Sequence, residues 1–285
     1  MKYFKKISKL TVMMLSVIIL STLGIDAFDN RSDLSGSLLG SVIGVGSKER
    51  SLCPEGMSYI SSAEGSFCID AYTVSAGKDC PYLKPSSQSE TRVNLNDQNC
   101  KAVSVAGADP WRWISQTQAQ TACSLAGKRL ASGKEWYEAA QGTPSDNRGL
   151  EGCNLFNNWF EQPGPTGTGE RCVSGRGTYD QVGNVWEWVS DTVRRGVING
   201  EKLPEAGYIT SVDATGLVLD TDPDHPDPNY TKDRFWINSE GTRGVMRGGF
   251  HGSGTDGGVY STHAEMTPDF AGRAVGFRCA SDVLR

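Results

Sequence analysis

The side chains best suited to chemistry in this chain are its three histidines and the polar residues near the last two. His225, His251 and His263 could form a metal site with a carboxylate, but their spacing matches no compact ligand motif. Loop histidines more often face solvent or make single hydrogen bonds. Ser253 lies close to His251, yet no base and orienting acid identify it as a nucleophile. These residues favour neither metal-dependent nor serine-dependent catalysis.

Eight cysteines form the second group of reactive side chains. In an exported chain such a number is typical of disulfides. Two pairs would close short loops, a third would bracket a segment rich in Pro and Gly, and the last two cysteines would then pair with each other. Sequence alone leaves many connectivities open, so this pairing is a hypothesis. The pairs are Cys53 with Cys68, Cys80 with Cys100, Cys153 with Cys172, and Cys123 with Cys279.

Two helices are expected to position the middle of the chain. Ser115 and Gln118 have the spacing of a capping box, which satisfies free backbone N–H groups at a helix start. Small residues at 119, 122, 123 and 126 then share one face, and Gly127 ends the helix. Ser132 and Glu135 repeat the capping spacing before a second helix, whose buried face holds Trp136 and two alanines at 139 and 140.

Short strands and loops are expected elsewhere. Alternation predicts strands at 57–60 and 67–74, separated by a turn at 64–65. The Pro-, Asp- and Gly-rich stretch beyond residue 191 is predicted to be a surface loop. Its carboxylates could hold a cation, but their spacing is not that of an EF-hand loop, and solvated charge is favoured. These carboxylates belong to Asp220, Asp222, Asp224 and Asp227.

The first 52 residues are expected to lie outside the folded domain. Four lysines precede an apolar run at 10–25, and the small residue Ala27 follows, which is the pattern of a secretory signal at 1–27. The apolar run is shorter than the roughly 20 residues of a membrane-spanning helix. Cleavage and secretion are therefore favoured, with an uncleaved anchor as the alternative route to a membrane. Residues 28–52 have the Gly and Ser content of a linker, although their apolar residues also suit a docking strand.

The charge of the chain limits its partners. The formal net charge of −5 becomes −8 once the four lysines and Asp26 of the signal are removed. No Lys or Arg cluster remains that could neutralise a phosphate backbone, so nucleic-acid binding is not expected. The composition favours sugars, peptides, cations or protein surfaces.

Four motifs, FCIDAY, GKRLASGKEWYEAAQG, VGNVWEW and the stretch from RGG (247–249) to GFRC (276–279), resemble those of the formylglycine-generating enzyme family, also called the sulfatase-modifying factor family. The resemblance covers roughly residues 53–282. It implies an α+β, irregular, loop-rich fold of the C-type-lectin-like kind over residues 53–285, tied by disulfides. It also implies that the cysteine before GKRL, Cys123, is bonded to Cys279.

Family oxidases carry two copper-binding cysteines six and eleven positions after the Arg of RGG. Counted from Arg247, these positions hold Ser253 and Gly258. Soft thiolates select Cu(I), and neither a hydroxyl nor a hydrogen replaces them. Copper is therefore not expected, and the chain is predicted to be noncatalytic. An oxidase or another nonheme metal enzyme of the family, with a rearranged site, is the alternative.

The resemblance implies a structural calcium site around VGNVWEW. Its ligands would be the Asp180 carboxylate, the Gly183 and Val185 carbonyls and the Glu187 carboxylate, hard oxygens that suit this ion. Alternatively, Glu187 pairs with a buried Arg, and the two tryptophans beside it fill the core. A second family site begins at a pair resembling Asn154-Leu155, but its acidic partner is not evident.

The segment between RGG and GFRC resembles the C-terminal region of lectin-like variable proteins of diversity-generating retroelements. In those proteins the exposed positions of this segment change to alter ligand choice. Tyr, His and small polar residues on a rigid support suit such a surface. Residues 250–273 are therefore predicted to bind a cell-surface protein or a carbohydrate, with an ordinary surface loop as the alternative. The candidate residues are His251, Ser253, Asp256, Tyr260, Thr262, His263, Glu265, Asp269, Phe270 and Arg273.

Overall fold

The computed structural model describes residues 52–62, 65–145 and 149–284. The chain divides into two units, Met1–Ser51 and Leu52–Arg285, and every described residue belongs to the second. The predicted signal and nearly all of the predicted linker therefore lie outside the described residues. Among the described residues, no helix is long and apolar enough to span a membrane.

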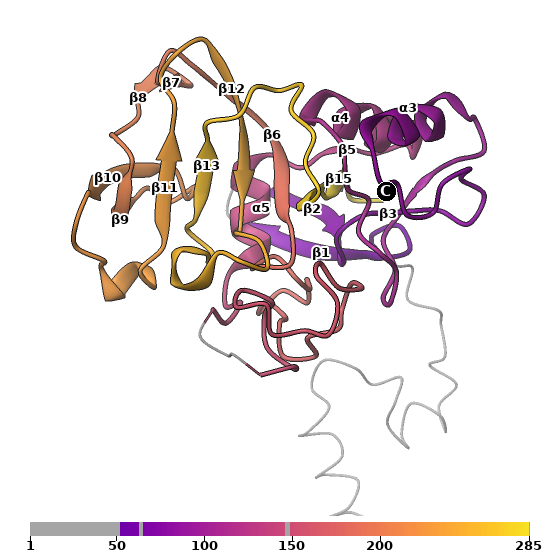
Figure 1. The fold of residues 1–285 in the computed structure, drawn as a ribbon, viewed down its shortest axis with the longest axis horizontal. Coiled ribbons are helices and arrows are strands. Elements are labelled where there is room, and N and C mark those ends of the chain that lie inside the picture. Colours follow the sequence, from indigo (N-terminus) through magenta and orange to yellow (C-terminus); the bar gives the residue numbers. More distant parts are fainter. Residues whose placement is uncertain (1–51, 63–64, 146–148, 285) are drawn as a thin grey trace, which may run out of the picture. The chain divides into compact units, whose positions relative to one another are not determined.

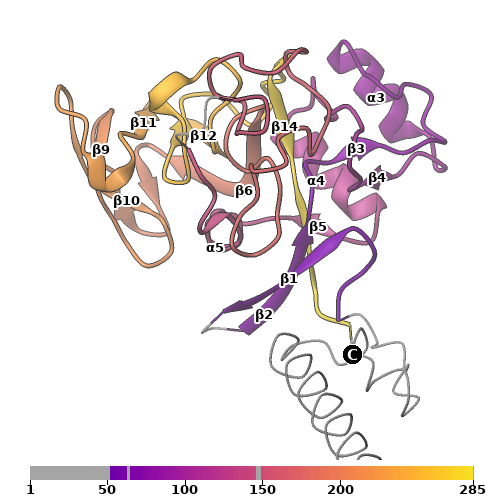
Figure 2. The ribbon, with the colours of Figure 1, turned by 90° about the horizontal axis from the view of Figure 1, so that it is seen from below.

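A four-stranded sheet joins the two ends of this unit. Its order is β1 (Met57–Ser62), β2 (Gly65–Asp70), β15 (Cys279–Asp282) and β5 (Arg129–Leu130), and all its pairs are antiparallel. Figure 2 shows β1 and β2 beside the long C-terminal segment that carries β14 and β15. The alternating strands predicted near 57–60 and 67–74 are confirmed as β1 and β2, although β2 ends at Asp70. A small separate ladder pairs β3 (Ser75–Ala76) with β4 (Ala102–Val103).

The larger sheet has nine strands in the order β10-β9-β11-β13-β12-β6-β7-β8, with β14 also paired to β6. Strands β11, β13, β12 and β6 stand side by side in Figure 1. The strands are β6 (Trp186–Arg194), β7 (Val197–Ile198), β8 (Glu201–Lys202), β9 (Gly207–Val212), β10 (Val218–Asp222), β11 (Arg234–Ile237), β12 (Thr242–Arg247), β13 (Thr262–Ala264) and β14 (Val275–Phe277).

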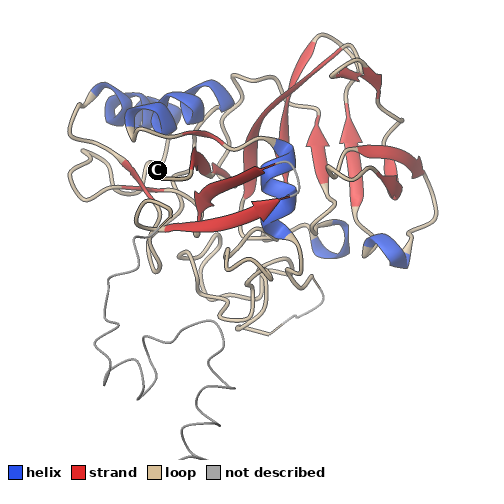
Figure 3. Ribbon diagram, turned by 180° about the vertical axis from the view of Figure 1, so that it is seen from behind, coloured by secondary structure: helices blue, strands red, loops and turns tan. Residues whose placement is uncertain are grey.

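Within the described part of the chain, three helices pack around the sheets (Figure 3). They are α3 (Gln88–Asn96), α4 (Gln116–Leu125) and α5 (Gly133–Ala140). Both predicted capping boxes are confirmed, at Ser115 for α4 and Ser132 for α5. Helix α4 packs into a core that includes Trp188 and Met246, whereas α5 places Trp136 in a second core with Val193. The two helices therefore cover different parts of the hydrophobic interior.

Four disulfides stabilise the loops between these elements. They are the four pairs expected from the sequence, Cys53–Cys68, Cys80–Cys100, Cys153–Cys172 and Cys123–Cys279. Cys123–Cys279 connects α4 to β15 across 156 positions of the chain. Disulfides of this number are typical of proteins outside the cytosol.

The structure corrects two expectations about irregular segments. The stretch beyond Asp191, predicted to be a surface loop, carries β7 to β11, and its 220–230 part enters β10 and a short 3-10 turn at Pro228–Tyr230. The alternating residues 207–212 form β9, a signal that the surrounding Pro, Asp and Gly obscured. Helix α3 was also missed, because its sequence is almost entirely polar. A further 3-10 turn spans Gly254–Asp256.

Candidate functional site

One face of the large sheet carries a row of large side chains at a single level. The strand register aligns Trp236 with His263, His263 with Met246, and Met246 with Trp188, which faces Phe277. Trp188, Met246 and Phe277 are buried, whereas Trp236 and His263 are half-buried. The row therefore runs from the hydrophobic core to the surface.

The surface end of this row is a cluster of three rings. The centroids of Trp186 and Trp236 lie 5.6 Å apart with their planes at 88°, and His263 lies 5.5 Å from Trp186 and 5.9 Å from Trp236. Nε2 of His263 lies 3.1 Å from a carboxylate oxygen of Glu265, whose side chain is 41% exposed, against 13% for His263. Burial lowers the pKa of His263, and the Glu265 charge opposes that shift. Trp186 is buried, so the half-buried rings of Trp236 and His263 supply the accessible aromatic surface, and Glu265 forms a hydrogen-bonding rim beside them.

Two of the ten candidate ligand-binding residues are buried. His251 uses Nδ1 to contact Oδ1 of Asn157 at 2.7 Å, and burial, together with the charges of Arg273 and Arg112, lowers the pKa of its ring. Thr262 lies on the opposite face of the sheet from His263, because side chains alternate along a strand. Neither residue is placed to meet a large ligand at the surface.

The other eight candidates are half-exposed or exposed, but they do not gather at one place. Tyr260 contacts Tyr137 and Tyr230, with ring centroids 6.0 and 5.2 Å away. Ser253 accepts a hydrogen bond from the Phe250 backbone N–H at 2.9 Å. His263 belongs to the ring cluster, Glu265 lies at its rim, and Asp256 is half-exposed. The exposed residues are Asp269, Phe270 and Arg273.

Trp236 was missed as a candidate because it lies outside the segment 250–273. The sequence RFWI at 234–237 has the composition of a strand, in which Phe235 is buried and Trp236 is half-buried. Alternation of this kind predicts a strand with two different faces. Only the register with His263 shows that Trp236 belongs to the same surface.

The position of the second family cysteine has no room for a side chain. A Cβ atom added at Gly258 would lie 2.2 Å from Oδ1 of Asp233. That carboxylate is buried, accepts hydrogen bonds from the backbone N–H groups of Tyr260 and Ser261, and is held by Thr231. Burial raises the pKa of Asp233 to about 7, against these hydrogen bonds. A fixed acid therefore occupies the space that a thiol at residue 258 would need.

Glu187, one of the predicted calcium ligands, lies in a buried hydrogen-bond network. Its Oε2 accepts from Nε of Arg278 and from the indole N–H of Trp136, both at 2.7 Å. Its Oε1 accepts from the Thr73 hydroxyl at 2.7 Å. Arg278 donates further to the Asp70 carbonyl, and both charged side chains are fully buried. The alternative in which Glu187 pairs with a buried Arg describes this arrangement.

Asp180 is the predicted calcium ligand with an unused oxygen. Its Oδ2 accepts from the backbone N–H of Gly167, whereas Oδ1 is buried without a partner, as is Oδ1 of Asn154. Burial raises the pKa of Asp180 to about 7, although Gly167 and Arg278 oppose the shift. The residues thus fit a calcium ion in part, because Asp180 has a free oxygen and both Glu187 oxygens are occupied.

The three histidines do not form a common site. His225 lies in an exposed loop beside Asp222, His251 contacts Asn157, and His263 lies in the ring cluster. Within the described ranges, no group of three or more His, Cys, Asp or Glu side chains is arranged to hold a metal ion. All eight cysteines are bonded in disulfides.

The fold and these motifs define a class of protein. Residues 56–283 match the model of the sulfatase-modifying factor enzyme 1-like domain, so the chain belongs to that family. The predicted α+β, loop-rich, C-type-lectin-like fold of this family is thereby confirmed.

The sequence identity of this chain to individual known proteins is low. The formylglycine-generating enzyme of Thermomonospora curvata is 29% identical over 192 residues, which cover 60% of this chain and 55% of that protein. The chain thus spans about half the length of this curated relative. Among solved structures, the Major Tropism Determinant U1 variant has a TM-score of 0.44 at 14% identity, covering 82% of this chain and 54% of that one. Treponema denticola variable protein 1 has a TM-score of 0.43 at 13% identity, covering 81% and 100%.

Proposed function

We propose that this chain is a noncatalytic ligand-binding protein that recognises a cell-surface protein or a carbohydrate. The observation that supports it is the row of side chains that leaves the core at Trp236 and His263, with Glu265 at its rim. Aromatic rings with a polar edge present large, rigid contact area at low entropic cost. The binding surface is therefore the ring cluster, contributed in part by the predicted segment 250–273.

The absence of available thiols supports a role without turnover. A serine and a glycine hold the two positions after RGG where family oxidases have cysteines, and Gly258 faces the fixed Asp233 carboxylate. A copper site of the family type needs thiolate ligands, and the eight cysteines of this chain are all bonded to one another. Conversion of a thiol-bearing sulfatase peptide to its aldehyde by the purified protein, in air with copper, would contradict this proposal.

We also propose that the protein acts outside the cytosol, after export directed by residues 1–27. The four disulfides support this location, because they persist in oxidising compartments. A surface-exposed location brings the ring cluster within reach of glycans and proteins of other cells.

Calcium is proposed as a structural ion near Asp180. The support is the buried Oδ1 without a partner, since an unpaired carboxylate oxygen is costly in the interior. Carbonyls of Gly183 and Val185 would complete the site, and Glu187 would join it only by giving up a contact with Arg278. The ion would hold the loops around 154–185 together and would keep the Asp180 carboxylate ionised.

The binding surface is tested with a triple variant, Trp236→Ala, His263→Ala and Glu265→Ala. Binding of the labelled protein to an array of immobilised glycans and to immobilised cell-surface proteins is compared before and after the substitutions. We expect bound signal to fall at least about tenfold, because hot-spot aromatic residues each contribute 2 kcal/mol or more.

The matched control is His225→Ala, which removes a histidine whose side chain is 84% exposed from a separate loop. It should leave binding unchanged. Equal binding by the triple variant and the unmodified protein, with both correctly folded by circular dichroism, would reject the ring cluster as the binding surface.

A further inference from the structure

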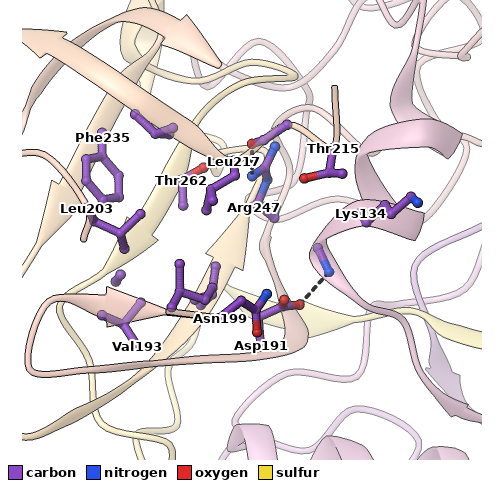
Figure 4. A pocket seen from close by; sticks show the side chains of 16 residues that line it. Lys134, Asp191, Val193, Asn199, Leu203, Thr215, Leu217, Phe235, Arg247 and Thr262 are labelled. Atoms are coloured by element: carbon purple, nitrogen blue, oxygen red, sulfur yellow. Dashed lines mark hydrogen bonds between the residues drawn. The ribbon is translucent and has the colours of Figure 1, made fainter. Parts of the chain in front are cut away.

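A cavity of about 170 Å³ lies on the face of the large sheet opposite the ring cluster. Residues of β6, β7, β10 to β13, the loop before β10 and the start of α5 line it. The lining is divided by chemistry. Figure 4 shows Phe235, Leu203 and Val193 at one end, and Arg247, Thr215 and Lys134 at the other. The cavity is thus apolar at one end, and its polar lining combines the cations of Arg247 and Lys134 with the Asp191 carboxylate.

Arg247 is the central polar group of this cavity. Its side chain is only 4% exposed. Nη1 donates to the Gly216 carbonyl at 3.0 Å and Nη2 to the Val259 carbonyl at 3.3 Å, while Nε has no partner. The guanidinium lies over the Trp136 ring, 5.4 Å from its centroid. Among the described residues, no carboxylate forms an ion pair with it.

The nearby acids are committed to other partners. Asp191 accepts from the backbone N–H of Gly133 at the start of α5. Asp213 accepts hydrogen bonds from the backbone N–H groups of Thr215 and Leu217. Asp233 accepts hydrogen bonds from the backbone N–H groups of residues 260 and 261. Their charges only partly offset the effect of burial, which lowers the pKa of Arg247 to about 10. The guanidinium therefore stays charged at neutral pH.

A buried charge without an ion-pair partner, next to an apolar cavity wall, suits an anion with an apolar body. Burying a charge without a counter-ion is costly, and an Arg–carboxylate pair recovers much of that cost through charge-assisted hydrogen bonds. The size is informative too, since an apolar cavity of about 150 Å³ accommodates one benzene ring.

We propose that this cavity binds a small organic carboxylate whose apolar body is about the size of one six-membered ring. The carboxylate pairs with Arg247, and the ring occupies the end formed by Phe235, Leu203 and Val193. The site lies on the other face of the sheet from the ring cluster, so it stands independently of the function proposed above.

The probe is phenylacetate, titrated into the purified protein by calorimetry, with phenylacetamide as its neutral counterpart of equal shape. We expect saturable binding of phenylacetate and at least about tenfold weaker binding of the amide, because a hydrogen bond to a charged group contributes about 1.5–3 kcal/mol. Equal affinities would show that Arg247 does not distinguish a charged ligand from a neutral one. Absence of saturation at millimolar phenylacetate would show that the cavity does not bind this class of ligand. Either result overturns the proposal.

Two variants localise the binding. Ala264→Leu extends a side chain into the cavity, because Ala264 is buried and lines it, and it should abolish phenylacetate binding. Its matched control, Ala214→Leu, lies at an exposed position outside the cavity and should bind normally. A folded Arg247→Met variant should bind phenylacetate and phenylacetamide with equal affinity. If Arg247→Met does not fold, the result for Ala264→Leu still tests whether the cavity is the binding site. Unchanged binding in Ala264→Leu would refute the cavity as the site.

Discussion

The Glu187–Arg278 pair gives the sharpest test of how the interior is held together. Both side chains are fully buried, and Arg278 also donates to backbone carbonyls at Asp70, Ala71 and Tyr179. Glu187→Gln keeps the shape of the side chain but removes its charge. Arg278 then remains buried without a counter-ion.

The expected loss follows from that unpaired charge. Removing one partner of a buried ion pair costs about 3–5 kcal/mol. Unfolding entropy is about 2.1 cal/mol/K per residue, so a unit of 234 residues has about 0.5 kcal/mol/K. The melting temperature of Glu187→Gln should therefore fall by about 6–10 °C.

Calorimetry with added calcium and with EDTA separates the two roles considered for Glu187. If the ion pair is its role, the loss is the same under both conditions. If Glu187 is a calcium ligand, the loss is large with calcium and nearly disappears in EDTA. A fall in melting temperature below about 2 °C under both conditions would refute the reasoning from the buried pair.

Two further predictions concern buried carboxylates. Gly258→Cys should lower the free energy of unfolding by about 1–3 kcal/mol through overpacking against Asp233, measured by guanidinium unfolding, whereas Ser253→Cys should lower it by less than about 1 kcal/mol; equal effects would contradict the predicted lack of space. The pKa values of Asp180 and Asp233, about 7, exceed that of the unfolded chain, so the folded state holds these protons more tightly and each carboxyl reduces stability as pH rises from about 4 to 7. Asp233→Asn should make the slope of unfolding free energy against pH less negative in that window, and saturating calcium should do so through Asp180; an unchanged slope in Asp233→Asn would contradict the assignment.

Local sequence patterns predicted the elements whose signals are short-range. Ser115 and Ser132 begin their helices as their capping spacing predicts, because a capping box involves only four consecutive residues. The disulfides followed from loop closure and the family resemblance. Helix α3 and strands β7 to β11 were missed, since a polar helix gives no apolar stripe and Pro or Gly can flank a strand without interrupting it.

The candidate site was only partly predictable because it depends on strand register. Trp236 and His263 are 27 positions apart and meet only because β11 pairs in parallel with β13. Thr262 appeared equivalent to His263 in sequence, yet alternation places it beside the cavity. Likewise, the family resemblance implied that Asp180 and Glu187 bind one calcium ion. Only the fold shows that Arg278, distant in sequence, forms an ion pair with Glu187. Contacts of this kind cannot be read from local spacing.

The central place of β15 in the first sheet has a consequence for biogenesis. Its Cys279 N–H bonds to the Asp70 carboxylate, 209 positions earlier, and the strand fills the space between β2 and β5. Strands β2 and β5 are therefore synthesised well before β15, the strand with which both of them pair. Contacts between residues so far apart in sequence make folding slow. Until β15 is present, the edges of β2 and β5 that it will cover are unpaired and prone to mispairing. This topology is compatible with the proposed export of an unfolded chain, since the domain cannot close before β15 has been synthesised.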